Sequence, residues 1–150
     1  MKSLIVINVL IITAGAFFTP LWAVYSHHIG GDLRTAGNAI GLFSVSIGVF
    51  TCIAGKIENY CDWDEYFVVG SQLMFVLGYF CFFFIVHPWQ LYFVQIWLGL
   101  AGSIQVPALF SLYQRYMPLN KATFAWGLWN GFYNIAVGIG AFASAYVAHI

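Results

Sequence analysis

The sequence predicts an all-α integral membrane protein built from five transmembrane helices. Of its 150 residues, 62% are hydrophobic and only 7% are charged, whereas soluble globular domains carry about 25% charged residues. The charged residues also lie near the boundaries between long apolar runs, as expected for a chain whose solvent is lipid. A soluble globular fold is therefore disfavoured, and the net charge of zero gives no indication of nucleic-acid binding.

Five apolar runs divide the chain, and each is long enough to cross a bilayer, which takes about 20 residues in a helix. They do not fit barrel strands, because such strands are about ten residues long and alternate between apolar and polar side chains. The expected spans are residues 4–25, 36–55, 66–86, 89–112 and 124–148, which together form a single transmembrane domain over residues 1–150.

The first run has an alternative interpretation as a cleaved signal peptide. Lys2 precedes it, and the small residues Ala14, Gly15 and Ala16 are similar to a cleavage site. The hydrophobicity nevertheless continues well past these residues, as far as Trp22. We therefore expect this run to be retained as the first transmembrane helix.

Basic residues predict the orientation of the helices, because cytoplasmic loops carry an excess of Lys and Arg. With the N-terminus inside, the inside segments hold Lys2, Lys56, Arg115 and Lys121, and the outside segments hold Arg34 alone. We therefore expect the N-terminus inside. We also expect a multi-pass protein of the plasma (inner) membrane.

Small residues recur along one face of the second run and again along the fifth. They let helix backbones approach closely in lipid, and two of them have the GxxxG spacing that is typical of packed transmembrane helices. The expected helix-packing positions are Gly41, Gly48, Gly127, Gly131 and Gly138.

Neutral polar residues inside the runs are the candidates for a functional site. Unpaired polar groups are costly in lipid, so these side chains should face the interior of the helix bundle. They could form hydrogen bonds between helices or line a cavity for a polar solute, and the sequence leaves both interpretations open. The candidates are Asn8 and Thr13 in the first run, Gln95 and Gln105 in the fourth, and Asn130 and Asn134 in the fifth.

Residues that could carry catalysis or bind a metal are not grouped within the runs. No nucleophile is paired with a base there, and the adjacent His27 and His28 have no third ligand beside them. The three cysteines have neither metal-ligand spacing nor a disulfide pattern. We expect no enzymatic activity, no metal site and no cofactor.

Three segments, taken in order, point to a family. The first is the loop after the second run, with Gly55, Glu58, Asn59 and Asp62. The second is Gln95-Ile96-Trp97-Leu98-Gly99 with Pro107-Ala108-Leu109, and the third is Gly138-Ile139-Gly140-Ala141. Together they resemble the N-terminal half of a major facilitator superfamily transporter, which has two six-helix halves, and they cover about five of its twelve spans.

The loop segment is similar to the inside-loop signature of this family, in a degenerate form. Gly55 matches the first glycine of the signature, but Asn59 stands where the family has aspartate and Asp62 where it has glycine. In the fourth run, Gln95 stands where family members have an arginine that is often tied to proton coupling. In the fifth, Ala141 stands where the antiporters have a proline.

The resemblance implies transport of a small organic solute by alternating access around a site near the bilayer midplane. The six polar candidates would then line the cavity and bind a neutral or weakly charged solute. The expected partners are the lipid bilayer, the solute, and a second transporter half or a second copy of the chain.

With five spans, the chain is expected to be a truncated or split half-transporter. The alternative hypothesis is a non-transporting helical membrane protein that acts as a scaffold or as a partner-binding subunit. The identity of the solute, the coupling ion and the direction of transport stay open at this point.

Overall fold

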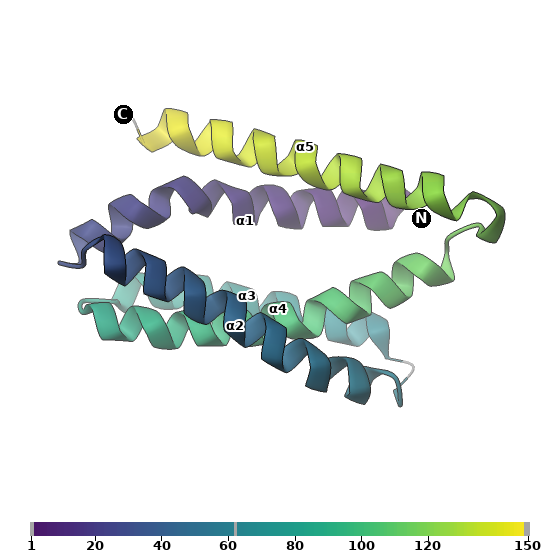
Figure 1. Cartoon of the computed structure of the whole chain (residues 1–150), viewed down its shortest axis with the longest axis horizontal. Helices are drawn as coiled ribbons and strands as arrows, with labels where there is room; N and C mark the ends of the chain where they lie inside the picture. The colour runs from purple at the N-terminus through teal and green to yellow at the C-terminus, as the bar shows by residue number, and fades with distance from the viewer. Residues whose placement is uncertain (1, 62, 149–150) are drawn as a thin grey trace. The chain divides into compact units, whose positions relative to one another are not determined.

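The computed structural model describes residues 2–61 and 63–148 of the chain. The described residues form five α-helices and two short 3-10 helices, and they contain no strand. The elements are α1 (Lys2–His28), α2 (Leu33–Glu58), α3 (Asp64–Cys81), η1 (Phe82–Phe84), α4 (Pro88–Arg115), η2 (Leu119–Lys121) and α5 (Ala122–Ala148) (Figure 1). The all-α fold is therefore confirmed, with one helix at each apolar run.

A capping side chain decides where α2 begins. The helix starts at Leu33, ahead of the apolar run, because Asp32 caps it. The backbone N–H of Thr35 donates to Oδ1 of Asp32 at 2.9 Å, and the Thr35 hydroxyl accepts from the Asp32 backbone N–H at 3.4 Å. This reciprocal pair satisfies backbone donors that the first helical turn leaves without partners.

The turn between α3 and α4 is closed in a similar way by a side chain. Oε1 of Gln90 accepts hydrogen bonds from the backbone N–H groups of Val86 and His87, at 2.8 and 3.0 Å. α4 then begins at Pro88, where the missing N–H of proline would have had no helical partner.

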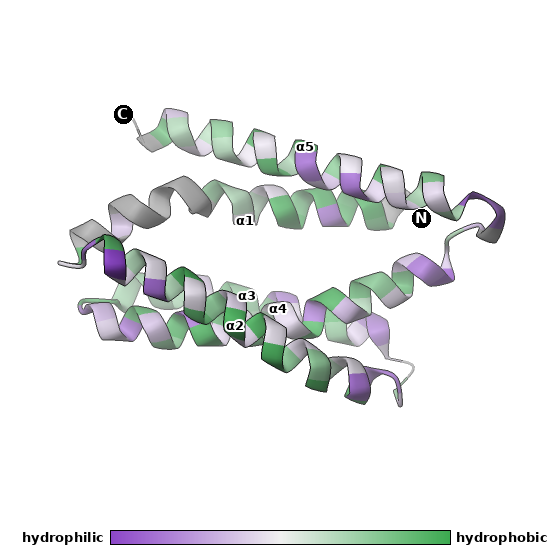
Figure 2. Cartoon of the chain, viewed as in Figure 1, coloured by the Kyte–Doolittle hydropathy of each residue, from purple (hydrophilic) through white to green (hydrophobic). Residues whose placement is uncertain are grey.

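Three helical segments in the described part of the chain are long and apolar enough to cross a membrane. They are Leu33–Glu58, Asp64–Phe84 and Pro88–Arg115. Figure 2 shows that α2 is mainly hydrophobic, with its most hydrophilic residues at the two ends. α1 contributes a shorter apolar stretch, Leu4–Phe17, and α5 is not among the candidates found in the described residues. The spanning role of α1 and α5 stays a prediction.

The helices form two compact units. The first unit, Met1–Tyr25 with Arg115–Ile150, contains α5 and most of α1. The second unit, Ser26–Gln114, contains α2, α3 and nearly all of α4.

In the second unit, α2 and α4 lie side by side and run in the same direction. Ser46 of α2 lies beside Gly99 of α4, and further along both helices Gly55 lies beside Pro107. The contacts advance along both helices in the same order, so α2 and α4 are parallel, as Figure 1 also shows.

α3 runs antiparallel to α4 in the same unit. The indole Nε1 of Trp97 donates to the backbone oxygen of Met74 at 2.9 Å, and the Ser111 hydroxyl donates to Oδ2 of Asp64 at 2.7 Å. The direction of the chain therefore alternates from α2 to α3 to α4. Successive membrane spans with short loops require this alternation.

Glycines allow α4 to lie close to both neighbours. A Cβ atom at Gly99 would lie 2.5 Å from Cβ of Ser46 and 2.9 Å from the backbone oxygen of Phe43. On α3, a Cβ atom at Gly78 would lie 2.5 Å from Cδ2 of Leu98. At Gly99 a larger residue fits only if a helix moves, whereas at Gly78 the side chain of Leu98 would have to shift, so both are close-packing positions.

The first unit has its own close contact. α1 and α5 run in the same direction, and they meet at Gly140 (Figure 1). A Cβ atom at Gly140 would lie 2.7 Å from the backbone oxygen of Thr13 and 2.8 Å from Cβ of Ala16. Buried residues at helical spacing mark the same face of α5, namely Ala125, Trp129, Ala136, Gly140 and Ser144.

The five glycines predicted to pack helices are not contact points inside the described chain. A Cβ atom at any of them would meet no atom within 4 Å; they are Gly41, Gly48, Gly127, Gly131 and Gly138. At 100° per residue, those of α2 lie on a different face from its buried Ala39, Ser46 and Ala54, and those of α5 lie opposite the Gly140 face. Their packing against another polypeptide stays a prediction.

Candidate functional site

Gln95 and Gln105, the two predicted amides of α4, are both buried. Their exposed fractions are 3% and 7%. Nε2 of Gln105 has no hydrogen-bond partner among the described residues. A buried donor without a partner costs about 1–3 kcal/mol, so Gln105 is a group that gains from binding an acceptor.

The spacing of these two glutamines limits how a solute could use them. Ten residues of α-helix rise by about 15 Å, which is about half of the bilayer hydrocarbon thickness. A small solute therefore cannot contact Gln95 and Gln105 at the same time through direct hydrogen bonds. The two amides mark different depths along one helix.

Asn8 and Thr13 belong to the first unit. Asn8 is buried, with 4% of its surface exposed. The hydroxyl of Thr13 donates to the backbone oxygen of Val9 at 2.8 Å, so its hydrogen is used within α1. The Thr13 oxygen can still accept a hydrogen bond from a ligand, because a hydroxyl has two lone pairs.

Asn130 and Asn134 are exposed on α5, and each donates to its own helix. Nδ2 of Asn130 bonds the backbone oxygen of Trp126 at 3.0 Å, and Nδ2 of Asn134 bonds that of Asn130 at 2.8 Å. Bonds of this kind satisfy polar side chains locally. Within the described residues these amides therefore do not link helices, and their place in a cavity stays a prediction.

The six candidates are thus divided between the two units. Asn8, Thr13, Asn130 and Asn134 are in the first, and Gln95 and Gln105 are in the second. Within a unit, the structure brings together the neighbours Asn130 and Asn134. A common substrate cavity formed by all six is still an expectation from the sequence.

Glu58, which the sequence places in the inside-loop motif after the second run, is a buried carboxylate. It is the last residue of α2, it is 8% exposed, and both of its carboxylate oxygens are buried with no hydrogen-bond partner among the described residues. A signal was present in the sequence: Glu58 follows Ala54 by one turn, on the face of α2 that carries the buried Ala36 and Ala54.

Asp64, at the start of α3, is a second buried carboxylate near the same end of the unit. It is 5% exposed and accepts the hydrogen bond from Ser111. Its position in the first turn is favourable, because the N-terminus of a helix carries a partial positive charge. Asp64 therefore joins α3 to α4.

The rest of the inside-loop motif is less buried. A Cβ atom at Gly55 would lie 4.0 Å from Cβ of Pro107, an ordinary contact distance, and the backbone N–H of Asn59 caps α2 on the oxygen of Gly55 at 3.1 Å. Asp62 lies outside the described residues. No group of three or more His, Cys, Asp or Glu side chains among the described residues is placed to hold a metal ion.

Comparison with known families places almost the whole chain in one of them. The sequence profile of the Major Facilitator Superfamily matches residues 4–150. Comparison with curated proteins and with solved structures found no match.

Proposed function

The chain belongs to the major facilitator superfamily, a family of membrane transporters rather than enzymes, and we propose that it moves a small organic solute by alternating access. In this mode, two bundles of helices rock about a site near the bilayer midplane. The family and the apolar helices make it an integral membrane protein.

Gln105 is the observation that carries this proposal. Its amide nitrogen is buried, lies on the most buried helix of the second unit, and lacks a partner among the described residues. An oxygen of a bound solute would supply the missing acceptor. Because Gln95, Gln105, Asn8 and Thr13 are all neutral, the solute that they suit is neutral or weakly charged.

The proposal includes a partner and an orientation. The distribution of Lys and Arg supports the N-terminus inside, and we place the protein in the plasma (inner) membrane. A second transporter half or a second copy of the chain would provide the opposite wall of the cavity. The exposed Asn130 and Asn134 would then face that cavity from α5.

Uptake measurements test the site. We would express the natural gene product in cells and measure uptake of labelled hexoses, polyols and neutral amino acids. The single variants Gln105→Ala and Asn130→Ala should each reduce uptake of at least one transported solute. Gln114→Ala is the matched control, since Gln114 lies exposed on the same helix as Gln105. Unchanged uptake in both site variants would remove the proposed site.

A scaffold or partner-binding role is the second candidate function. The observation in its favour is the open space beside the glycines of α2 and α5, which another helix could fill. Crosslinking in native membranes distinguishes the two functions. A transporter should crosslink to a second transporter half or to itself, whereas a scaffold should capture subunits of a different family.

A further inference from the structure

We propose that a pocket at the C-terminal end of α2 binds a small lipophilic ammonium ion, with the Glu58 carboxylate as its counter-ion. This site lies within the second unit and is separate from the amides that support the transport proposal. Its test is a binding measurement, so its failure would leave that proposal untouched.

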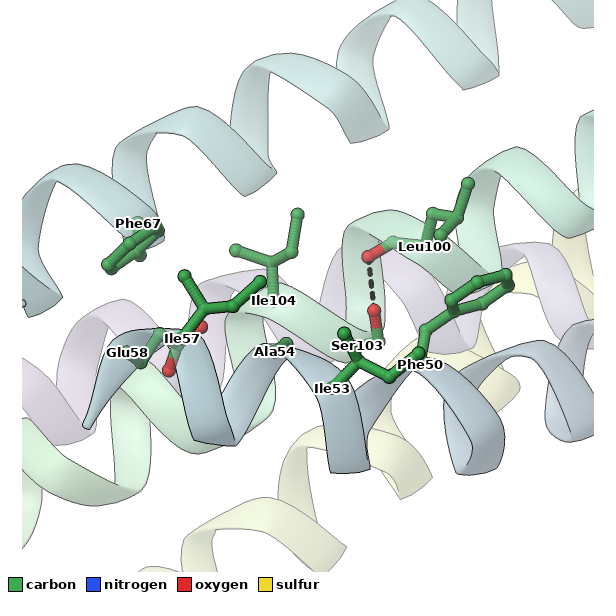
Figure 3. Close-up of a pocket in the computed structure, with 9 residues that line it drawn as sticks. All are labelled: Phe50, Ile53, Ala54, Ile57, Glu58, Phe67, Leu100, Ser103 and Ile104. Atoms are coloured by element: carbon green, nitrogen blue, oxygen red, sulfur yellow. Dashed lines mark hydrogen bonds between the residues drawn. The ribbon is translucent and has the colours of Figure 1, made fainter. Parts of the chain in front are cut away.

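The pocket has the size and the walls for a short alkyl chain. Its volume is about 200 Å³, which is room for about six or seven groups the size of a water molecule. α2, α3 and α4 all contribute to its lining (Figure 3). The lining residues are Phe50, Ile53, Ala54, Ile57, Glu58, Phe67, Leu100, Ser103 and Ile104.

Glu58 is the one ionisable side chain among the described residues that line this pocket. Both of its oxygens are buried and have no hydrogen-bond partner in the described chain. An unpaired carboxylate in apolar surroundings is costly, and a cation beside it offsets part of that cost. The hydroxyl of Ser103 does not meet this need, because it donates to the backbone oxygen of Leu100 at 2.7 Å (Figure 3).

Two further features favour a positive charge at this position. The negative charge of Asp64 repels that of the Glu58 carboxylate. Glu58 also ends α2, and the C-terminal end of a helix carries a partial negative charge. The two carboxylates and the helix end therefore favour a cation.

The apolar walls favour an organic cation over a metal ion. Calcium takes about six to eight oxygen ligands and magnesium requires octahedral oxygen coordination. The pocket offers one carboxylate and otherwise mainly aliphatic and aromatic side chains such as Ile57 and Phe67. An ammonium group with a hydrocarbon tail matches both parts, because its charge pairs with Glu58 while the tail replaces water along the walls.

Hexylammonium, with about seven non-hydrogen atoms for a pocket of this size, is the probe for this site. Calorimetric titration would use the full-length protein in nanodiscs of zwitterionic lipid, with empty nanodiscs as the baseline and hexanol as the neutral analogue. Saturable binding of hexylammonium, tighter than that of hexanol, is expected. Equal binding of hexanol, or no saturable binding of hexylammonium, overturns the proposal.

Two variants locate the binding. Glu58→Gln keeps the shape of the side chain and should weaken hexylammonium binding by about tenfold or more, since it removes a charge-assisted contact. Glu65→Gln is the matched control, because Glu65 is exposed in the first turn of α3 and should leave binding unchanged. Unchanged binding in Glu58→Gln would contradict the assignment.

A third variant tests the site independently, in case Glu58→Gln does not fold. Ile104→Trp should fill the pocket while leaving the carboxylate in place, and it should abolish saturable binding of hexylammonium. If Ile104→Trp still binds the probe as the wild type does, the ligand lies elsewhere and the proposal is wrong. Helical circular dichroism and elution volume would show that each variant is folded.

Discussion

α4 and α5 carry the same kinds of residue and use them differently. Each has amides and glycines along its length: α4 has two glycines and the candidate amides Gln95 and Gln105, and α5 has four glycines and two asparagines. α4 buries Gln95 and Gln105, and its Gly99 and Gly102 lie against side chains of α2 and α3. α5 exposes its two asparagines, and three of its glycines have open space beside them.

The difference shows that a pattern of small residues permits close helix packing but does not establish that a neighbouring helix is there. A glycine becomes a packing position when a neighbouring helix lies on its face. On α5 that happens at Gly140, whereas Gly138, two residues away and on a different face, has no atom near its Cβ position. The exposed face of α5 is the part of the comparison that a partner would change.

The strongest test of this comparison is to add one methyl group to each helix. Gly99→Ala forces α2 to move, because the new Cβ would lie 2.9 Å from the backbone oxygen of Phe43, and overpacking of this kind costs about 1–3 kcal/mol. Gly138→Ala meets no atom and should be neutral or stabilising. Reversible unfolding in mixed micelles would measure both. Equal stability of the two variants would break the comparison.

A polar contact gives the next effect in size. Ser111→Ala removes the hydroxyl that donates to the buried carboxylate of Asp64, and it should cost about 1–2 kcal/mol. Ser103→Ala is the control, since that hydroxyl donates only within its own helix. The same unfolding assay applies. A larger loss in Ser103→Ala than in Ser111→Ala would show that the α3–α4 contact does not hold this end of the unit.

Replacement of an amide should change the stability by a smaller amount, and in opposite directions on α4 and α5. Gln105→Leu removes a buried donor without a partner and should raise the stability by about 1 kcal/mol. Asn130→Leu removes a hydrogen bond to its own helix and should cost about 0.6 kcal/mol or less. Stability and uptake should then diverge, since Gln105→Leu should be more stable and less active. A loss of stability in Gln105→Leu would show that its amide is paired.

The smallest expected effect lies at the cap of α2, away from both helices. The backbone and side-chain hydrogen bonds from Thr35 lower the pKa of Asp32 below its ordinary value. A lowered folded-state pKa means that this contribution is present above about pH 4 and is lost as the pH falls through the folded-state value. Asp32→Asn should remove that acid-dependent loss while keeping a cap, which thermal unfolding between pH 3 and pH 6 would reveal. An identical pH profile in the variant would exclude a role for the Asp32 charge.

The helices themselves could be predicted from the sequence because a chain in lipid must pair its backbone groups internally. The apolar runs therefore located all five helices, and the Asp32–Thr35 cap and Pro88 account for boundaries a few residues outside the runs. What could not be predicted was which face of each helix has a neighbour. The neighbouring face depends on how the helices are aligned with one another, and the residue pattern of a single helix does not determine that alignment.

Glu58 illustrates this limit at the candidate site. Its place in the loop motif after the second run suggests contact with solvent, whereas Glu58 follows the buried Ala54 by one turn of α2. The two indications disagree at the last turn, and the packing of α3 and α4 decides between them. Gln105 shows the reverse, since its burial was expected from the cost of an amide in lipid, while its lack of a partner was visible only in the structure.

The side-chain closure of the turn between α3 and α4 has a consequence for the biogenesis of the protein. Because Gln90 ties that turn and Trp97 reaches back to Met74, these two helices can pair as soon as both are synthesised. The contact of Gly140 with Thr13 instead joins residues that lie more than a hundred positions apart in the chain, and it must wait until α5 is synthesised. We expect the α3–α4 hairpin to enter the bilayer as one piece. Cysteine crosslinks between positions 64 and 111, whose side chains are hydrogen-bonded in the folded protein, should then form in nascent chains still attached to the ribosome, before α5 emerges.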